Sequence, residues 1–222
     1  MADLKTTSLT LPATRDDLAK LEIGTAVRLT GRIFTAREGV YKRAVSDEVP
    51  LPASPQELGT ANFHCSPAAT LEADGTPKLG AVTATASFRF AKWLEGWFAI
   101  SKCNIIIGKG GMSSADYKRA FVPAGAIYLT TVGYGTGALL GRGVKRVVAT
   151  HWTEELGLAQ GIWVLDCEDL GPFIVASDLE GNCLFERENE KIADRISALY
   201  DGTRPATLKR YGETDDKTDE VI

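Results

Sequence analysis

The stretch "IIIGKGGMSSADYKRAF", residues 105–121, decides the fold class of this chain. Its uninterrupted apolar run is typical of a central strand that is buried on both faces. Three glycines around Lys109 then predict a tight turn, and Ser113 or Ser114 is suited to cap a following helix. A strand, a glycine loop and a helix in this order either hold an anion or only turn the chain. The Walker pattern GxxxxGK[ST] is absent, so a bound nucleotide is not indicated.

Further strands and helices are predicted on both sides of this stretch. Phe90, Trp93, Leu94 and Trp97 recur at i, i+3, i+4 and i+7, which predicts one buried face of a helix. Apolar, β-branched segments predict strands over residues 25–36 (bent at Gly31), 61–66, 80–87, 103–108, 124–132 and 161–168. Helices are predicted over 14–22 (capped by Thr14), 37–48, 113–121 and 187–200, and a hairpin is predicted to turn at 180–182.

This alternation of apolar strands with helices that must cover them predicts a layered α/β domain with a mixed sheet. We expect one domain over residues 1–200. Residues 201–222 are polar and acidic without periodicity, and we expect them to form a flexible tail.

Composition narrows the class of partner. The 222-residue chain has 29 acidic and 25 basic side chains and a formal net charge of −4, which argues against nucleic acid or an anionic membrane as the main partner. No apolar run is long enough to span a bilayer and no signal peptide is recognisable, so a cytoplasmic location is expected. The cysteines are widely spaced and the chain has only two histidines, so no metal site is expected; the cysteines are Cys65, Cys103, Cys167 and Cys183.

Three basic residues share an unusual position, since each lies between a predicted strand and a predicted helix. They are Arg37, Arg89 and Lys109. A cation at a helix N-terminus opposes the helix dipole, whereas the ends of strands in α/β sheets are where ligands bind. The three residues therefore indicate a pocket for an anionic substrate, with arginine suited to a bidentate contact with a carboxylate. Three unrelated surface cations remain the alternative reading.

Each of two other stretches can be interpreted in two ways. Residues 133–143, "GYGTGALLGRG", are predicted to form a loop with a short helix, with or without contact to a ligand. His151 and Trp152 are either part of a catalytic site or a packed aromatic pair at the start of a helix. The hydroxyl residues Thr83, Thr85 and Ser87 lie just before Arg89, and a threonine can act as a base only where strong positive charge lies nearby.

Seven motifs in order along the chain together carry a resemblance to a known family. They are "LTGRIFTAREGVYKR", "FHCSP", "TATASFR", "IIIGKGGM", "FVPAGAIYLTTV", "HWTEELG" and "LGPFIVASDLEGNCLFE". From about residue 8 to residue 200, the chain resembles the beta subunit of two-subunit iron–sulfur hydro-lyases, namely L(+)-tartrate dehydratase and class I fumarase. It likewise resembles the C-terminal domain of one-chain fumarases.

The resemblance implies a swivelling β/β/α domain and an alpha subunit that carries a [4Fe–4S] cluster on three cysteines. The resemblance also implies an αβ or α2β2 assembly and a hydroxy-dicarboxylate substrate. By position in the motifs, the substrate-binding residues are Arg37, Arg89, Lys109, Gly108 and Gly110. Thr85 matches the threonine proposed in the family to take the carbon-bound proton.

The chain departs from the family pattern at three positions that we expect near the substrate. Tyr41 stands where a histidine is usual, and Ala84 and Ala86 replace a proline and a second threonine. These differences leave the substrate and its stereochemistry open. The same differences motivate a second hypothesis for the function of the chain: a non-catalytic anion-binding or regulatory module that uses the same basic pocket.

Overall fold

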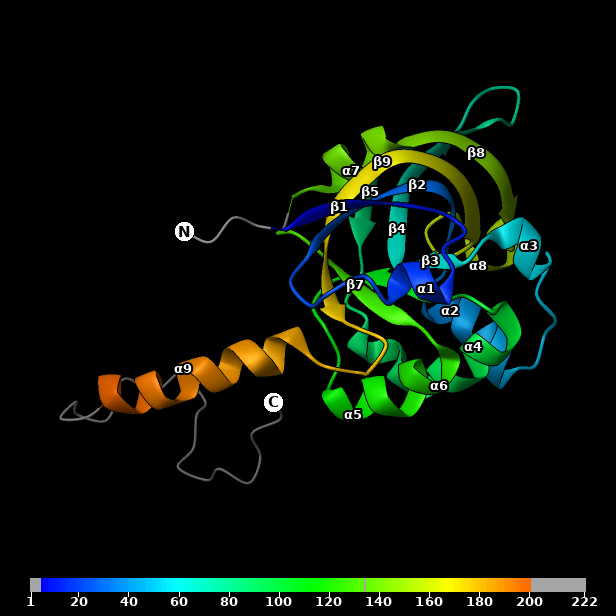
Figure 1. Ribbon diagram of the computed structural model, residues 1–222. Helices are drawn as coiled ribbons and strands as arrows, with labels where there is room; N and C mark the ends of the chain where they lie inside the picture. The colour runs from blue at the N-terminus through cyan, green and yellow to red at the C-terminus, as the bar shows by residue number, and fades with distance from the viewer. Residues whose placement is uncertain (1–4, 134, 201–222) are drawn as a thin grey trace, which may run out of the picture. The chain divides into compact units, whose positions relative to one another are not determined.

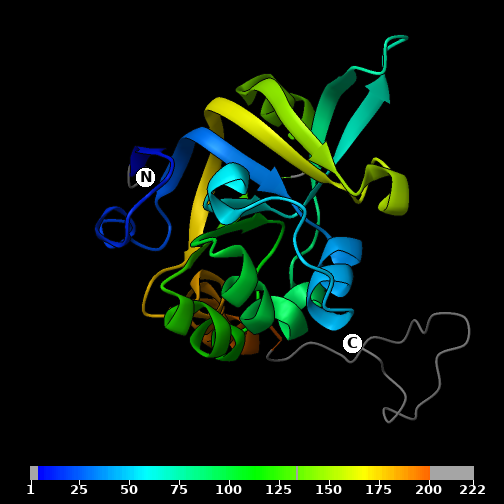
Figure 2. The same cartoon turned by 90° about the vertical axis from the view of Figure 1, so that its right-hand side faces the viewer.

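The computed structural model describes residues 5–133 and 135–200 of the chain (Figures 1 and 2). The chain divides into two compact units, Met1–Arg187 and Glu188–Ile222. In the second unit, the described residues continue helix α9 (Leu184–Tyr200). The expected tail lies outside the described residues, and one domain over residues 1–200 stays a prediction.

The first unit alternates strands with short helices. Its strands are β1 (Thr6–Thr10), β2 (Ala26–Thr35), β3 (Ala61–Phe63), β4 (Cys65–Leu71), β5 (Pro77–Ala84), β6 (Ile105–Gly108), β7 (Ile127–Thr131), β8 (Val144–His151) and β9 (Ile162–Ser177). Its helices are α1 (Arg15–Leu18), α2 (Glu38–Tyr41), α3 (Pro55–Leu58), α4 (Leu94–Ser101), α5 (Ser114–Asp116), α6 (Val122–Ala124), α7 (Gly137–Gly143) and α8 (Thr153–Leu156). The π-helical turns η1 (Lys42–Ser46) and η3 (Tyr117–Phe121) continue α2 and α5. The 3₁₀ helix η2 (Phe88–Trp93) precedes α4.

A seven-stranded mixed sheet with the order β1-β2-β3-β6-β7-β9-β8 forms the centre of this unit. Strands β2, β3, β6 and β7 are parallel, whereas β9 runs antiparallel to β7, β8 and β2. Because β9 pairs with both β7 and β2, the central strands close into a ring. Strands β4 and β5 form a separate two-stranded sheet, and helices form the third layer. The predicted layered α/β domain with a mixed sheet is confirmed.

Strand β6 is central, as its apolar sequence predicts, because its two faces enter two different cores. Ile105 and Ile107 pack with Ile127 and Leu129 inside the ring. Ile106 faces the other way, into a core with the helices. Side chains alternate between the faces of a strand, so only a strand that is covered on both sides needs an unbroken apolar run.

The helical layer covers one side of the sheet, where α2, α4, α5 and α6 gather (Figure 1). The predicted face of Phe90, Trp93, Leu94 and Trp97 is confirmed: all four are buried in the core beneath this layer. Their segment is a helix in two parts, η2 followed by α4. Ser113 is the N-cap of α5, and Thr14 caps α1 with a capping box, as their sequences predict.

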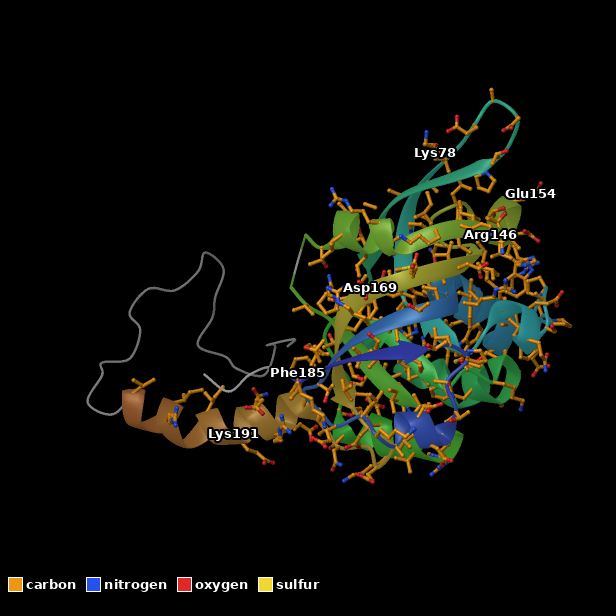
Figure 3. The ribbon with its side chains drawn as sticks, turned by 45° about the horizontal axis from the view of Figure 1, so that its top comes forward. Lys78, Arg146, Glu154, Asp169, Phe185 and Lys191 are labelled. Atoms are coloured by element: carbon orange, nitrogen blue, oxygen red, sulfur yellow. The ribbon has the colours of Figure 1, made fainter. Side chains whose placement is uncertain are left out.

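The hairpin of β4 and β5 projects from the opposite side, with Lys78 close to its tip (Figure 3). The prediction of one strand over 61–66 is wrong, because the chain changes sheets at His64, between β3 and β4. The strand predicted over 80–87 begins earlier, at Pro77, and ends at Ala84. Figure 3 also shows Arg146 and Asp169 on β8 and β9, where exposed ion pairs link Arg146 to Asp166 at 2.5 Å and Arg28 to Asp169 at 2.9 Å.

The predicted hairpin at 180–182 is also wrong. Residues 162–177 form the single long strand β9, and the turn that follows it leads into α9. The Asp178 carboxylate accepts hydrogen bonds from the N–H groups of Glu180 and Asn182, both at 3.1 Å. The Asp178 side chain thus stabilises the turn locally. Residues of the types common in hairpin turns connect a strand to a helix at this position. The sequence reading also missed strands β1 and β8.

Candidate active site

The carboxyl ends of the parallel strands bring two of the predicted cations to one edge. The pairings place Thr35, Phe63, Ile107 and Leu129 side by side on β2, β3, β6 and β7. Two residues beyond this row come Arg37, Cys65, Lys109 and Thr131. Strands β2 and β6 are separated only by β3, so with about 4.8 Å between neighbouring strands their carboxyl ends lie roughly 10 Å apart. This is the edge at which α/β sheets bind ligands.

Thr85 and Lys109 are joined directly by their backbones. The Lys109 N–H donates to the Thr85 carbonyl at 3.1 Å, and Ala86 forms a parallel bridge with Lys109. The Thr85 N–H donates to the His64 carbonyl at 2.6 Å, which ties this junction to the end of β3. Thr85 is 8% exposed. The proposed base and the predicted lysine are therefore adjacent and held by the same ladder of hydrogen bonds.

Arg37 is the N-cap residue of α2, directly beyond the end of β2. Its Nη1 donates to the Ala159 carbonyl at 3.1 Å, while its buried Nε has no hydrogen-bond partner among the described residues. The guanidinium lies close enough to Cys65 to oppose the strong rise that burial causes in the pKa of that thiol. A buried cationic donor without a partner is costly, and a ligand carboxylate would satisfy it.

Arg89 lies four residues beyond Thr85, at the start of η2. It is exposed, and its guanidinium carbon lies 5.8 Å from the centre of the Phe90 ring. Its neighbour Phe88 is 63% exposed, which is unusual for so large an apolar side chain. This part of the site is thus open, with an apolar and a cationic side chain next to each other.

The glycine-rich segment that begins at Gly133 lies beside Lys109. A small cavity of about 60 Å³ is lined by Thr83, Ala84, Lys109, Thr131, Gly133, Gly135, Thr136 and Gly137. The predicted short helix after this loop is confirmed as α7. Sites for whole ligands usually measure several hundred Å³, so this cavity accommodates one end of a small acid, not all of it.

Gly108 and Gly110 have different environments. Gly108 is buried, and a side chain on it would meet the Ser87 Oγ at 1.9 Å and the Tyr128 Oη at 2.7 Å. Gly110 is exposed, with a φ of +72° and no atom within 4 Å of the place where a Cβ would lie. The first glycine of the motif is required by close packing beneath the site, and the second by the left-handed backbone of the turn.

The Gly108→Ala variant is expected to lower the free energy of unfolding by about 3 kcal/mol, since the new methyl group overlaps two buried hydroxyl groups. In thermal unfolding of the isolated chain this corresponds to a fall in Tm of roughly 6–12 °C. The matched control is Gly80→Ala on the exposed strand β5, where the nearest atom, the Ala68 carbonyl oxygen, is 3.3 Å away. Equal Tm values for the two variants would contradict the packing described here.

His64 lies beneath the site and is completely buried. Its ring nitrogens contact the Tyr41 hydroxyl and the Ser87 hydroxyl, both at 2.7 Å. Burial lowers the pKa of His64 to about 3, so the imidazole is neutral at physiological pH. The sequence reading considered His64 only as a metal ligand; its place in an otherwise apolar strand end was the available signal for a buried polar role.

The free energy of unfolding is expected to fall as the pH is lowered from 6.5 to 5. In the unfolded chain a histidine takes up a proton near pH 6.5, whereas the pKa of His64 in the fold is about 3, so the unfolded state binds more protons in this interval. The loss is about 1.5 kcal/mol by linkage and is measured by urea unfolding at several pH values. The His151→Gln variant, which changes the chain's other histidine, should keep this slope; a flat profile in the unchanged chain would refute the burial of a neutral His64.

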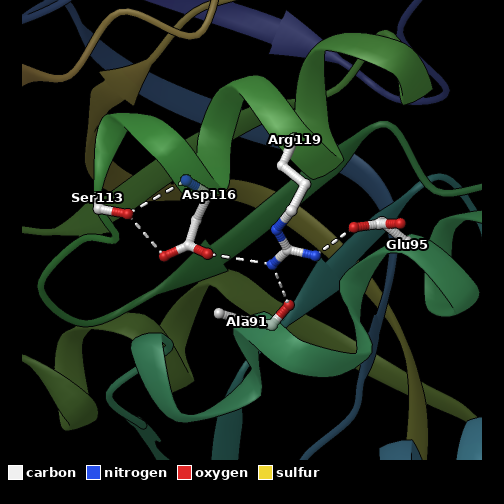
Figure 4. Close-up of polar contacts among 5 residues, drawn as sticks. All are labelled: Ala91, Glu95, Ser113, Asp116 and Arg119. Carbon is white, nitrogen blue, oxygen red and sulfur yellow. Dashed lines mark hydrogen bonds and ion pairs between the residues drawn. The ribbon is translucent and has the colours of Figure 1, made fainter.

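Arg119 connects the two helical segments that follow Arg89 and Lys109 (Figure 4). Its Nη2 donates to the Ala91 carbonyl in η2 at 2.9 Å and to Asp116 at 3.1 Å, and its Nη1 contacts Glu95. Asp116 in turn accepts a hydrogen bond from the Ser113 hydroxyl at 2.8 Å. The helical segment η2–α4 is thereby held to the segment α5–η3 that follows the loop after β6.

The three departures from the family pattern fall in different places. Ala84 lines the small cavity with Lys109, and Ala86 bridges to Lys109, so both lie beside this candidate residue. Tyr41 does not: it is 0% exposed and packs between the Phe90 and Trp97 rings at 5.4 and 4.4 Å. His151 ends β8, Trp152 is the N-cap residue of α8, and the Trp152 ring packs against Arg43.

The cysteines do not form a cluster site. All four are buried free thiols, and burial raises the pKa values of Cys65, Cys103 and Cys167. Within the ranges 5–133 and 135–200, no three or more histidine, cysteine, aspartate or glutamate side chains are grouped so as to hold a metal ion. Cluster ligation needs accessible thiolates, so these residues do not fit an iron–sulfur cluster.

The described residues form a layered α/β domain in which Arg37 and Lys109 follow the carboxyl ends of the parallel strands β2 and β6, and Lys109 is bonded through its backbone to Thr85. The chain belongs to the family described as "Fumarase C-terminus", whose model matches residues 2–188.

Curated relatives agree with this membership. One is "Putative L(+)-tartrate dehydratase subunit beta" of Methanocaldococcus jannaschii, 30% identical over 84% of this chain and 94% of the relative. "L(+)-tartrate dehydratase subunit beta" of Escherichia coli is 28% identical over 87% and 93%. "Putative fumarate hydratase class I" of Geobacillus stearothermophilus is 24% identical over 86% of this chain and only 35% of that longer protein. The expected class, a subunit of a hydro-lyase, is confirmed, since dehydratases and hydratases remove or add water.

The part of the chain that the structure describes contains no helix with both the length and the apolar character needed to cross a bilayer.

Proposed function

We propose that this chain is the beta subunit of a [4Fe–4S]-dependent hydro-lyase that binds a hydroxy-dicarboxylate and helps to eliminate or add water. The observation that carries the proposal is the junction of Thr85 and Lys109 at the carboxyl edge of the sheet, with Arg37 beyond the end of β2 on the same edge and Arg89 four residues after Thr85. A hydroxyl that acts as a base requires positive charge nearby, and the backbone bond between Thr85 and Lys109 supports this role for Thr85.

Each of these residues has a role in the proposal. Arg37, Arg89 and Lys109 bind the substrate carboxylates, and the orphaned Nε of Arg37 supports this role. Gly110 allows the backbone of the turn to approach the acid, and Gly108 lets the turn lie close to the buried layer below. The Thr85 oxygen takes the proton from the substrate carbon, with the neighbouring positive charge stabilising the anionic form of the threonine.

The cavity beside Lys109 supports the view that the site is shared with another chain. Its volume of about 60 Å³ suffices for a carboxylate end. The cluster, which supplies a Lewis acid for the departing hydroxyl when bound, is expected on an alpha subunit because the described cysteines do not fit it. The names of the tartrate dehydratase relatives, which are called subunit beta, support such a partner in an αβ or α2β2 assembly.

Exposed Phe88 beside Arg89 supports a contact with that partner at the same edge. The four free thiols support a reducing compartment, and we place the enzyme in the cytoplasm.

The test compares the purified chain with the chain co-expressed with a cluster-carrying partner. Dehydration of L(+)-tartrate and of malate is measured for both, together with iron content and colour. The chain alone should be colourless and inactive, and turnover and brown colour should appear only in the complex. Lyase activity from the isolated chain would refute the proposal, as would an iron-loaded complex without turnover of any hydroxy-dicarboxylate. Dicarboxylate binding without a recoverable partner would favour the non-catalytic module.

A further inference from the structure

A chain of buried side-chain hydrogen bonds runs directly beneath the proposed site. Its members, all 0% exposed, are Asn62, Tyr41, His64, Ser87 and Tyr128. The Tyr41 hydroxyl lies 2.8 Å from Asn62 Oδ1 and 2.7 Å from His64 Nε2. On the other side of the ring, His64 Nδ1 lies 2.7 Å from the Ser87 hydroxyl, which accepts from Tyr128 at 2.8 Å. Five polar side chains without access to water are thus linked in one series of hydrogen bonds.

The positions of the protons in this series of hydrogen bonds follow from Asn62, the residue at its end. The Asn62 amide group donates to the Phe34 carbonyl at 3.4 Å, so Oδ1 is the atom that accepts from Tyr41. The Tyr41 oxygen then accepts from the Nε2–H of His64. Nδ1 carries no proton and accepts from Ser87, whose own oxygen accepts from Tyr128. Every donor points the same way, and a neutral imidazole with its proton on Nε2 is the form that fits.

Ser87 connects this chain to the residues above it. Its backbone N–H donates to the Lys109 carbonyl at 3.3 Å, and the Tyr128 hydroxyl lies 3.4 Å from the same carbonyl. Thr85 precedes Ser87 by two residues, and Arg89 follows it by two. Serine at an N-cap normally bonds the first helical N–H groups, yet the Ser87 hydroxyl makes no capping bond to η2. The Ser87 hydroxyl instead forms hydrogen bonds with the buried side chains of His64 and Tyr128.

His64 holds the same junction from the opposite side. Its carbonyl accepts the Thr85 N–H at 2.6 Å, and its own N–H donates to the Ile107 carbonyl at 2.7 Å. The side chain and the backbone of His64 are therefore both bonded to the segment 85–87. Rotation of Thr85 relative to Lys109 would have to break bonds that cannot be replaced by water.

We propose that His64 and Ser87 are positioning residues of the active site: a neutral His64, protonated on Nε2, fixes Ser87 and through it the relative placement of Thr85, Arg89 and Lys109. This inference rests on the proposed hydro-lyase function for its catalytic consequence. Its structural content, the protonation state and the rigidity of the junction, is independent of that function. His64 and Ser87 do not touch the substrate.

The protonation state is tested by ¹⁵N NMR of the isolated full chain. The expected result is a protonated Nε2, an unprotonated Nδ1 and no titration of His64 between pH 5 and 8, with His151→Gln used to assign the signals. A protonated Nδ1, or titration of His64 near pH 6.5, would overturn the proposal.

The positioning role is tested with Ser87→Ala and the control Ser101→Ala. Ser101 is equally buried, and its hydroxyl donates to the Trp97 carbonyl at 2.8 Å inside α4. Ser87→Ala should speed hydrogen exchange of the Thr85 and Lys109 amides at least tenfold in the isolated chain, and Ser101→Ala should not. In the assembled enzyme, Ser87→Ala should lower kcat about tenfold with little change in KM, whereas Ser101→Ala retains kcat. Unchanged exchange in Ser87→Ala, or equal kcat in both variants, would overturn the proposal.

The two proposals fail in different ways. If the unchanged assembled protein has no hydro-lyase activity, the proposed function is refuted, while the NMR and exchange measurements on the isolated chain still decide whether His64 and Ser87 fix the junction.

Discussion

The Arg89→Ala variant of the assembled enzyme is expected to lose about 100- to 1000-fold in kcat/KM, the usual cost of removing one charged donor from a reacting anion. Arg89 is exposed, and its side chain packs only loosely, 5.8 Å from the Phe90 ring centre. Its removal should therefore leave the fold intact while one substrate carboxylate loses its bidentate contact. The measurement is steady-state dehydration of a hydroxy-dicarboxylate by the complex, with thermal unfolding as a check on folding.

Two further variants make the Arg89 result specific. Arg89→Lys keeps the charge but not the planar pair of donors, so it should recover only part of the lost activity. Arg28→Ala removes an arginine whose 2.9 Å ion pair with Asp169 lies on the outer strand face, and it should leave kcat/KM unchanged. Full activity of Arg89→Ala would remove this residue from the substrate-binding set.

The Thr85→Val variant is expected to lower kcat by about 100- to 10,000-fold, the range for loss of a positioned acid–base group. Valine has nearly the same shape and keeps the backbone bonds of Thr85 to His64 and Lys109, which are 2.6 and 3.1 Å long. The loss should appear in kcat and not in the binding of the acid, because the carboxylate-binding cations are still present. Single-turnover kinetics with the complex separates these two quantities.

The matched control is Thr25→Val. Thr25 is 2% exposed, similar to the 8% of Thr85, but it lies at the amino end of β2, away from the site. Its substitution should affect stability alone. If Thr85→Val retained kcat, the proton would have to be taken by another group, and the proposed role of Thr85 would be wrong.

Much of the fold was predictable because local patterns agree with the tertiary structure. The unbroken apolar run 105–107 predicted a central strand, and β6 lies in the middle of the sheet between two cores. The i, i+3, i+4, i+7 spacing from Phe90 to Trp97 predicted a buried helical face correctly. Predictions failed where tertiary pairing overrides local signals. Strand β8 is a partly exposed edge strand without a strong apolar pattern, and the turn after Ser177 was mistaken for a hairpin.

The candidate site was predictable in part. The position of Arg37 and Lys109 after strands was predictable, since Arg37 follows β2 and Lys109 follows β6 in the structure; that they bind one substrate stays a prediction. Tyr41 was expected near the substrate by its place in a motif, yet it is buried beneath the site with its hydroxyl on His64. The sequence did not indicate that Asn62 and His64 meet Ser87 and Tyr128, because Ser87 and Tyr128 come from two other segments of the chain.

The sequence by itself determined the central strand 105–108, the cap of the helix that follows it and the buried face from Phe90 to Trp97, since apolar periodicity, capping residues and glycines act over a few neighbouring residues. "IIIGKGGM" therefore already specified a central strand followed by a turn that carries Lys109. Only the tertiary structure decided what lies under that turn. The Ser87 and Tyr128 hydroxyls fill the space beside Gly108, and His64 binds Ser87 from the end of β3. Such contacts depend on strand order and register, which bring together side chains that are far apart in the sequence.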